Sequence, residues 1–145
     1  PKMISAVNKT VDSVVFDASR LPSAADKALF VHNYLVMNTR YNEQIASGST
    51  TDRNSIYTIY GALVEGDAVC QGYALAFNHI MRRMGVQCDF VISQAMNHGW
   101  SVIQLDKKSA NLLSRCSKKE DKNIKEVFIM KVLRKLFFKG YCLER

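Results

Sequence analysis

Cys70 stands where a cysteine can act as a nucleophile. It follows the turn residues Gly66 and Asp67 and opens an apolar pattern with helical spacing, so we expect it at the start of a helix. The unpaired amides and the dipole of a helix N-terminus favour the negative charge of a thiolate. The same amides can bind the oxyanion that forms when an acyl group is attacked. Cys70 is therefore the candidate nucleophile.

His98 is the candidate base for this thiol. It lies 28 residues after Cys70, at the edge of a β-rich segment. If that strand edge faces the helix N-terminus, the imidazole can take the thiol proton and form a thiolate–imidazolium pair. Trp100 lies on the same side of the strand as His98, because strand side chains alternate with period two. We expect Trp100 either to shelter the imidazole or to be a core aromatic.

Each of these residue types alone is weak evidence for catalysis. A cysteine on an apolar helix is most often a small core residue. His32 and His79 lie in the middle of expected helices, and we expect them to be structural or surface residues. Whether Cys70 and His98 are candidates for catalysis therefore depends on the sequence around them.

Three helices and two strands are expected to position the two candidates. The first helix has the apolar positions Ile4, Val7, Val11, Val14, Val15 and Ala18, although residues 14–16 would also suit a strand. The second helix begins at an N-cap, Ser23, and runs to about Thr39. Its expected apolar face is Ala25, Ala28, Leu29, Leu35 and Val36. The third helix runs from Cys70 to Met84, with Gly85 as its C-cap glycine, and residues 88–94 and 100–105 are expected to be antiparallel strands.

The basic charge of the chain lies entirely in its last part. The 145 residues carry a net charge of +7, but residues 1–106 hold 8 Lys/Arg against 9 Asp/Glu, whereas residues 107–145 hold 12 against 4. We therefore expect a core at residues 1–106 and a basic C-terminal segment, helical and of unclear origin, at residues 107–145. No apolar run is long enough to span a bilayer. The four cysteines have no metal-ligand spacing, so neither a zinc site nor a dense disulfide framework is indicated.

Three segments carry a resemblance to a known family, the bacterial transglutaminase-like proteins. Residues 60–77, which contain Cys70-Gln71-Gly72-Tyr73, resemble the nucleophile region of that family. Residues 97–102 resemble its histidine strand, whose usual form is His-Ala-Trp-Asn, and residues 31–41 resemble the helix that leads into the core. The resemblance covers residues 20–106.

This resemblance implies a papain-like α+β fold, with the nucleophile helix packed on a small antiparallel sheet that is incomplete if the tail is unrelated. It also implies a peptidase or acyltransferase that acts on protein or peptide amides through a thioester, with Cys70 and His98 as catalytic residues and no metal or organic cofactor. Secretion or a cell-surface location is weakly favoured. Gly72 would let the nucleophile helix pack closely, and Tyr73 would fill space beneath the site.

The sequence departs from the family pattern at the third catalytic position. Family members usually place an Asp about 15 residues after the histidine, where this chain has Leu113. Asp106 is a poor substitute because it lies far along the same strand, and Asn111 would reach only in a shifted register. The alternative is therefore a catalytically impaired transglutaminase-like module that serves binding or assembly.

The C-terminal segment itself has two interpretations. Residues 124–138 combine apolar and basic side chains in a pattern that suits a terminal helix docked on the core. The same pattern would suit a membrane surface or a protein partner. Nothing after Lys107 resembles the family, so the segment is either a divergent element or a non-homologous tail. No nucleic-acid-binding signature accompanies the basic charge, and nucleic acid is not an expected partner.

Overall fold

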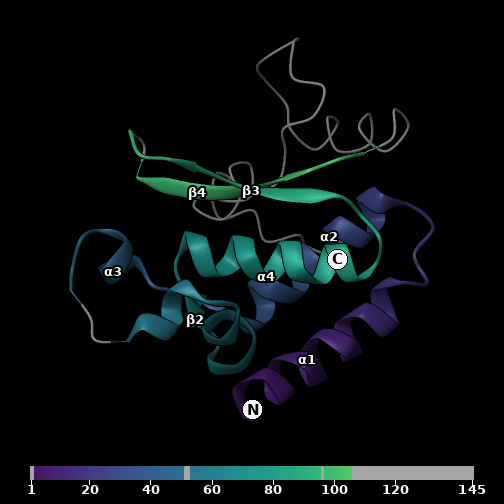
Figure 1. Ribbon diagram of the computed structural model, residues 1–145, viewed down its shortest axis with the longest axis horizontal. Coiled ribbons are helices and arrows are strands. Elements are labelled where there is room, and N and C mark those ends of the chain that lie inside the picture. The colour runs from purple at the N-terminus through teal and green to yellow at the C-terminus, as the bar shows by residue number, and fades with distance from the viewer. Residues whose placement is uncertain (1, 51–52, 96, 106–145) are drawn as a thin grey trace.

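The computed structural model of the chain describes residues 2–50, 53–95 and 97–105, and Figure 1 shows their arrangement. The elements follow in the order α1 (Lys2–Ala18), α2 (Ala24–Asn38), β1 (Arg40–Tyr41), α3 (Glu43–Ala46), η1 (Asn54–Tyr57), η2 (Gly61–Glu65), β2 (Asp67–Ala68), α4 (Cys70–Arg83), β3 (Cys88–Ser93) and β4 (His98–Ile103). The predictions for residues 107–145 lie outside the described residues. Among the residues that are described, no helix has the length and hydrophobicity needed to cross a membrane.

Helix α4 is the centre of the structure, with the β3–β4 sheet on one side and α1 and α2 on the other (Figure 1). Its side chains Phe77, Ile80 and Met81 are fully buried. Burying side chains of this size contributes about 1.5–3 kcal/mol each. The helix ends as predicted, with Gly85 in the left-handed conformation at φ 75°. An α+β fold, with the helix that begins at Cys70 packed on a small antiparallel sheet, is therefore confirmed.

The first helix has its predicted span, and α1 rules out the alternative of a strand at residues 14–16. Val11, Val14 and Ala18 face the core as predicted, but Ile4 is 67% exposed. Ile4 lies in the first turn of α1, and the burial begins with the later turns of the helix. The expected apolar face was therefore too long at its N-terminal end.

The second helix begins at the predicted N-cap. The Ser23 hydroxyl oxygen accepts a hydrogen bond from the Asp26 amide at 3.1 Å, and α2 ends where Thr39 becomes extended. The predicted face is wrong at one position, because Leu29 is 48% exposed whereas Val31 is fully buried. Residues two apart lie on nearly opposite sides of a helix, so a core that buries Ala28, Val31 and Leu35 leaves Leu29 on the outer side.

Strands β3 and β4 form the predicted antiparallel hairpin. Their residue pairs run from Cys88 opposite Ile103 to Ser93 opposite His98, and β4 begins two residues earlier than expected. A second sheet, in which β1 and β2 pair in parallel, was not predicted. It is held by hydrogen bonds from Arg40 N to Gly66 O and from Asn42 N to Ala68 O. This small sheet places the chain that enters α4 beside the end of α2.

Candidate active site

Cys70 is the first residue of α4, as predicted, and its thiol is free and half-buried. The preceding residue, Val69, is an extended N-cap that makes no side-chain capping bond. Helix geometry leaves the first amides of α4 without intrahelical partners, and they point out of the helix end that carries the thiol. This end of α4 can therefore stabilise negative charge on a thiolate or on an oxyanion.

The chain entering α4 packs so closely that residue 72 must be glycine. A Cβ atom at Gly72 would lie 2.6 Å from the Ile56 carbonyl oxygen and 3.1 Å from that of Thr58. The prediction that Gly72 permits close packing of the helix that begins at Cys70 is confirmed. Tyr73 lies beneath this turn, where its hydroxyl donates to the Thr39 carbonyl oxygen, and burial raises its pKa. Tyr73 is therefore a buried structural support of the first turn.

Contacts along one side of α4 fix its register against the sheet. The Ser101 hydroxyl donates to Ala74 O at 3.1 Å, Cys88 Sγ donates to Asn78 O at 3.5 Å, and Arg82 Nε donates to Cys88 O at 2.8 Å. Residues four apart lie on one face of a helix, so Cys70 belongs to the same row as Ala74 and Asn78. One turn along α4, from Ala74 to Asn78, therefore matches a shift of two residues along the strands, from the Phe90–Ser101 pair to the Cys88–Ile103 pair.

Extending this register by one further turn directs Cys70 toward one pair of strand residues, Ile92 and Gly99. These two residues are opposite each other in the hairpin, one step beyond the pair formed by Phe90 and Ser101. Their side of the sheet is the one that α4 covers, because Ser101 is bonded to α4 and alternate strand residues share a face. The thiol therefore faces the end of the hairpin that contains the turn.

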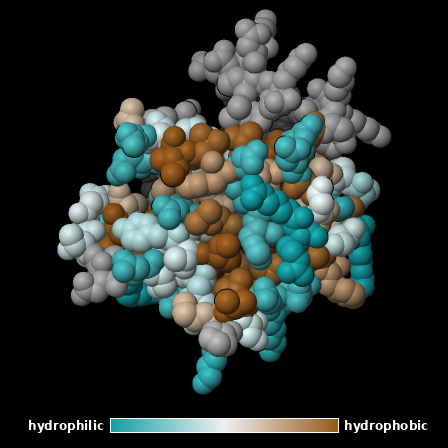
Figure 2. Space-filling view, viewed as in Figure 1, coloured by the Kyte–Doolittle hydropathy of each residue, from teal (hydrophilic) through white to brown (hydrophobic). Residues whose placement is uncertain are grey.

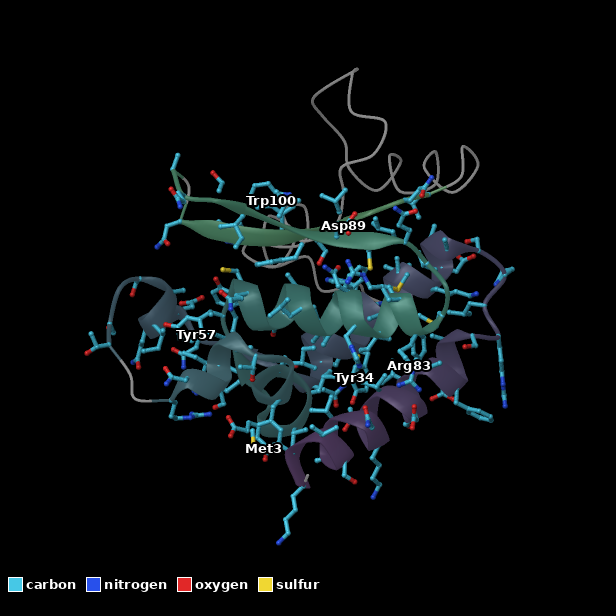
Figure 3. All side chains as sticks on the ribbon, viewed as in Figure 1. Met3, Tyr34, Tyr57, Arg83, Asp89 and Trp100 are labelled. Carbon is cyan, nitrogen blue, oxygen red and sulfur yellow. The ribbon has the colours of Figure 1, made fainter. Side chains whose placement is uncertain are left out.

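His98 lies at the same end of the molecule as Cys70 but on the other side of the β3–β4 sheet. Its ring stacks with that of Trp100, with the centroids 6.0 Å apart and the ring planes at 26°. Figure 3 shows Trp100 on the side of the sheet that faces away from α4, as alternation with Ser101 requires. The prediction that Trp100 lies on the same side as His98 is confirmed. The structure thus brings α4 and β4 together but directs the thiol and the imidazole toward opposite faces.

The end of β4 that carries His98 adjoins a tight turn. Asn97, the residue before His98, has a left-handed backbone with φ 43°. Asn tolerates this conformation better than most residues. The candidates for a third catalytic position, Asp106, Asn111 and Leu113, lie outside the described residues. Within the described part of the chain, no group of three His, Cys, Asp or Glu residues is arranged to hold a metal ion.

A buried carboxylate anchors the segment just before Cys70. Asp67 is 5% exposed, and its Oδ2 atom accepts from Arg40 Nη2 at 3.2 Å, Asn42 Nδ2 at 3.1 Å and Arg53 Nη1 at 3.2 Å. Arg53 also donates to Glu65, and hydrogen bonds from Ser55 and then Arg53 lower the pKa of Glu65. The prediction of a turn at Asp67 did not include this role. The signal in the sequence is an acidic residue just before an apolar helix, whereas its partners come from two distant segments that only the fold brings together.

The other two histidines, His32 and His79, are half-buried on α2 and α4. Burial lowers the pKa of both, although the hydrogen bond between His32 and Asn33 partly opposes this effect for His32. Each has a buried Nε2 atom with no hydrogen-bond partner among the described residues. A structural or surface role for both histidines stays a prediction.

The chain resembles one protein family in sequence and a solved structure in fold. The family model of the transglutaminase-like superfamily matches residues 13–130, which extends the resemblance at both ends of residues 20–106. The crystal structure of a TGase resembles the chain with a TM-score of 0.61 and 14% sequence identity, over 86% of this chain and 35% of that one. At that identity the likeness shows the fold alone, and the chain spans about a third of the length of that structure. No curated protein matches the chain.

Proposed function

The chain belongs to the transglutaminase-like superfamily, and from this premise we propose that it is a cysteine enzyme acting on protein or peptide amides. Cys70 is the proposed nucleophile and His98 the proposed base. The observation that carries the proposal is the position of Cys70, which opens α4 and belongs to the helix row that faces the sheet. A cysteine at that position combines a half-buried thiol with the free amides of a helix end.

The proposed reaction has two stages. His98 takes the thiol proton, and the Cys70 thiolate attacks the amide carbonyl carbon, whose oxygen becomes an oxyanion near the first amides of α4. The carbon–nitrogen bond then breaks, His98 returns the proton to the leaving amine, and a thioester remains on Cys70. In the second stage water or an amine attacks the thioester, giving an acid or a new amide and restoring the thiol. The residues themselves do not favour either acceptor.

The proposal has one geometric requirement. His98 is the terminal residue of β4 and stacks on Trp100 on the face away from α4. To reach the thiol, the imidazole needs a local change of backbone at the Asn97–His98 end of β4, because the backbone fixes the face on which a strand side chain lies. Such a change at the strand end is smaller than a shift of strand register, which moves every side chain to the other face.

The second candidate function is a transglutaminase-like module that binds or assembles without catalysis. The observation that favours it is the stacking of His98 on Trp100 on the opposite side of the sheet from Cys70. In such a module the Cys70 thiol would react as an ordinary half-buried cysteine. His98 would then contribute only to the stability of the hairpin.

Alkylation of Cys70 separates the two candidates. The wild-type chain and a His98→Ala variant are treated with iodoacetamide between pH 5.5 and 9, and labelling of each cysteine is followed by peptide mass mapping. Cys88 is an internal reference, because it is fully buried and burial raises its pKa. The enzyme proposal predicts rapid labelling of Cys70 below pH 7 that slows at least tenfold without His98. Equal rates in the two proteins would favour the non-catalytic module.

A functional assay completes the test. The wild-type chain is incubated with a glutamine-containing protein and a fluorescent primary amine, and both amine incorporation and ammonia release are measured. Cys70→Ala is the control without the nucleophile. Ammonia release without incorporation would indicate water as the acceptor, and neither product from the wild-type chain would oppose the enzyme proposal for this substrate class.

A further inference from the structure

The side of β3 that faces α4 changes from buried to exposed as it approaches Cys70. Cys88 is 1% exposed, Phe90 is half-buried, and Ile92 is 63% exposed, although all three side chains belong to the same face. Helix α4 covers this face of the sheet only from Cys70 onward, because Cys70 is the first residue of the helix. The end of the hairpin therefore overhangs the helix, and an apolar side chain projects from the overhang on the side of the thiol.

Gly99 allows an aromatic ring to lie under this overhang. A Cβ atom at Gly99 would come within 2.6 Å of the Phe90 ring and 3.6 Å of the Val91 carbonyl oxygen. The Phe90 ring thus occupies the space that a side chain at position 99 would fill. Phe90 and Ile92 lie on the same face of β3, at the end of the hairpin toward which the register directs Cys70, and we name these two residues the hairpin shelf. Figure 2 shows hydrophobic surface over the hairpin.

We propose that the hairpin shelf, Phe90 and Ile92, binds an apolar side chain of the acyl donor next to the amide that Cys70 attacks, and so sets the substrate preference of the enzyme. This inference rests on the proposed function. The occupant follows from the position of the shelf, because whatever lies on it is joined to the acyl group that reaches the thiol. Its chemistry follows from the exposed apolar side chain of Ile92 and from the half-buried ring of Phe90 on the same face of β3.

An apolar occupant has a clear energetic advantage here. Covering the exposed part of an isoleucine removes apolar surface from water, and full burial of such a side chain contributes about 1.5–3 kcal/mol. Partial cover by a substrate side chain corresponds to a preference of about three- to tenfold. A charged side chain at the same position would lose hydration without gaining a partner.

The test compares two reagents that differ only in an apolar group. Iodoacetamide and N-benzyl iodoacetamide alkylate thiols by the same displacement of iodide, so the ratio of their rates on Cys70 measures the contribution of the benzyl group. The ratio for N-acetylcysteine gives the intrinsic difference between the reagents. The proposal predicts a Cys70 ratio about three- to tenfold above that reference.

Variants localise the effect. Ile92→Ser should bring the ratio back toward that of N-acetylcysteine, and Phe90→Leu should lower it less. Ile4→Ser is the matched control, since Ile4 is 67% exposed on α1 and Ile92 is 63% exposed on β3. A wild-type ratio equal to that of N-acetylcysteine, or an Ile92→Ser variant that keeps the wild-type ratio, would overturn the proposal.

This measurement is independent of catalysis. It needs only a reactive thiol at Cys70. The ratio of the two labelling rates therefore measures binding to the hairpin shelf even if removal of His98 has no effect on labelling. A benzyl preference without His98 dependence would support the shelf and oppose the enzyme. His98 dependence without a benzyl preference would support the enzyme and oppose the shelf. Ile92 is mostly exposed, so its replacement should leave folding intact, which circular dichroism checks.

Discussion

The Ser101 hydroxyl donates a hydrogen bond to the carbonyl oxygen of Ala74 over 3.1 Å, and both residues are completely buried. Ala74 lies one helical turn after Cys70, and Ser101 lies two residues along β4 from Gly99. This one bond therefore sets which strand residues lie beside the thiol. It also sets the direction of His98, which is three residues before Ser101 and so on the opposite face of the strand.

Ser101→Ala should destabilise the protein by about 1 kcal/mol, because it removes a buried neutral hydrogen bond. The Ala74 carbonyl oxygen retains its place in the helix, so no buried acceptor is left wholly unsatisfied. The measurement is urea denaturation followed by circular dichroism. Ser47→Ala is the matched control, because the Ser47 hydroxyl also donates to a backbone carbonyl, that of Gln44 at 2.9 Å, but is exposed. Equal losses in the two variants would show that burial of the Ser101 bond is not what matters.

Asp67→Ala should strongly destabilise the segment that leads into α4. It removes the shared acceptor of Arg40, Asn42 and Arg53, and breaking a buried charged network costs about 3–5 kcal/mol. Because both arginines are partly exposed, we expect a value at or below the lower end of that range. Denaturant unfolding gives the loss of free energy.

The control for Asp67 is an exposed ion pair of similar length. Asp89 accepts from Arg82 at 3.0 Å, with both side chains more than half exposed. Asp89→Ala should therefore cost less than about 1 kcal/mol. If the two aspartate variants lose similar stability, the buried position of Asp67 has no special importance. If Asp67→Ala also slows labelling of Cys70, the network positions the start of α4.

The start of α4 was predictable because its signals are local. Gly66 and Gly85 both adopt left-handed backbones at the turns that precede and follow the helix, and Ser23 caps α2 in the same readable way. The β1–β2 pairing was not predictable, because strands of two residues show no periodicity. The choice between Leu29 and Val31 also depended on tertiary packing.

The sequence did not determine which face of the β3–β4 hairpin packs against α4, and this face decides on which side His98 lies. Alternation groups His98 with Trp100, and it groups Gly99 with Ser101, but it does not say which group meets α4. Side-chain bulk suggests that Trp100 should be buried, yet α4 packs against Ser101, and the Phe90 ring covers Gly99. The small side chain of Ser101 allows helix and sheet to approach closely, and this packing directs the imidazole away from Cys70.

Gly72→Ala should destabilise the first turn of α4 by about 1–3 kcal/mol, the usual cost of overpacking. The added methyl group would meet the backbone oxygen of Ile56 at 2.6 Å, and a backbone atom cannot rotate away as a side chain can. The segment of η1 must therefore shift, which alters the surroundings of Cys70. Thermal unfolding measures the loss of stability, and the rate of iodoacetamide labelling measures the change at the thiol.

The comparison for Gly72 is Gln71→Ala, which removes the hydrogen bond from the Gln71 amide to the Tyr57 carbonyl oxygen at 3.2 Å. This bond is exposed, and its loss should change stability by less than about 0.5 kcal/mol. A Gly72→Ala variant that is as stable as Gln71→Ala would mean that η1 yields without cost. The close packing of η1 on α4 would then not constrain the site.

The stability of the protein should fall as the pH drops through about 6.5, the ordinary pKa of histidine. Burial lowers the pKa of His32 and His79 in the folded state, so between the folded and unfolded pKa values the unfolded chain binds more protons. Protonation then favours unfolding, and the effect grows until the pH lies below the folded pKa values. Urea denaturation at pH 7.5, 6.5 and 5.5 measures the slope. His32→Gln and His79→Gln should each flatten it, because each imidazole has a buried Nε2 atom without a hydrogen-bond partner among the described residues, whereas a slope that is unchanged in both variants would assign the acid sensitivity to carboxylates.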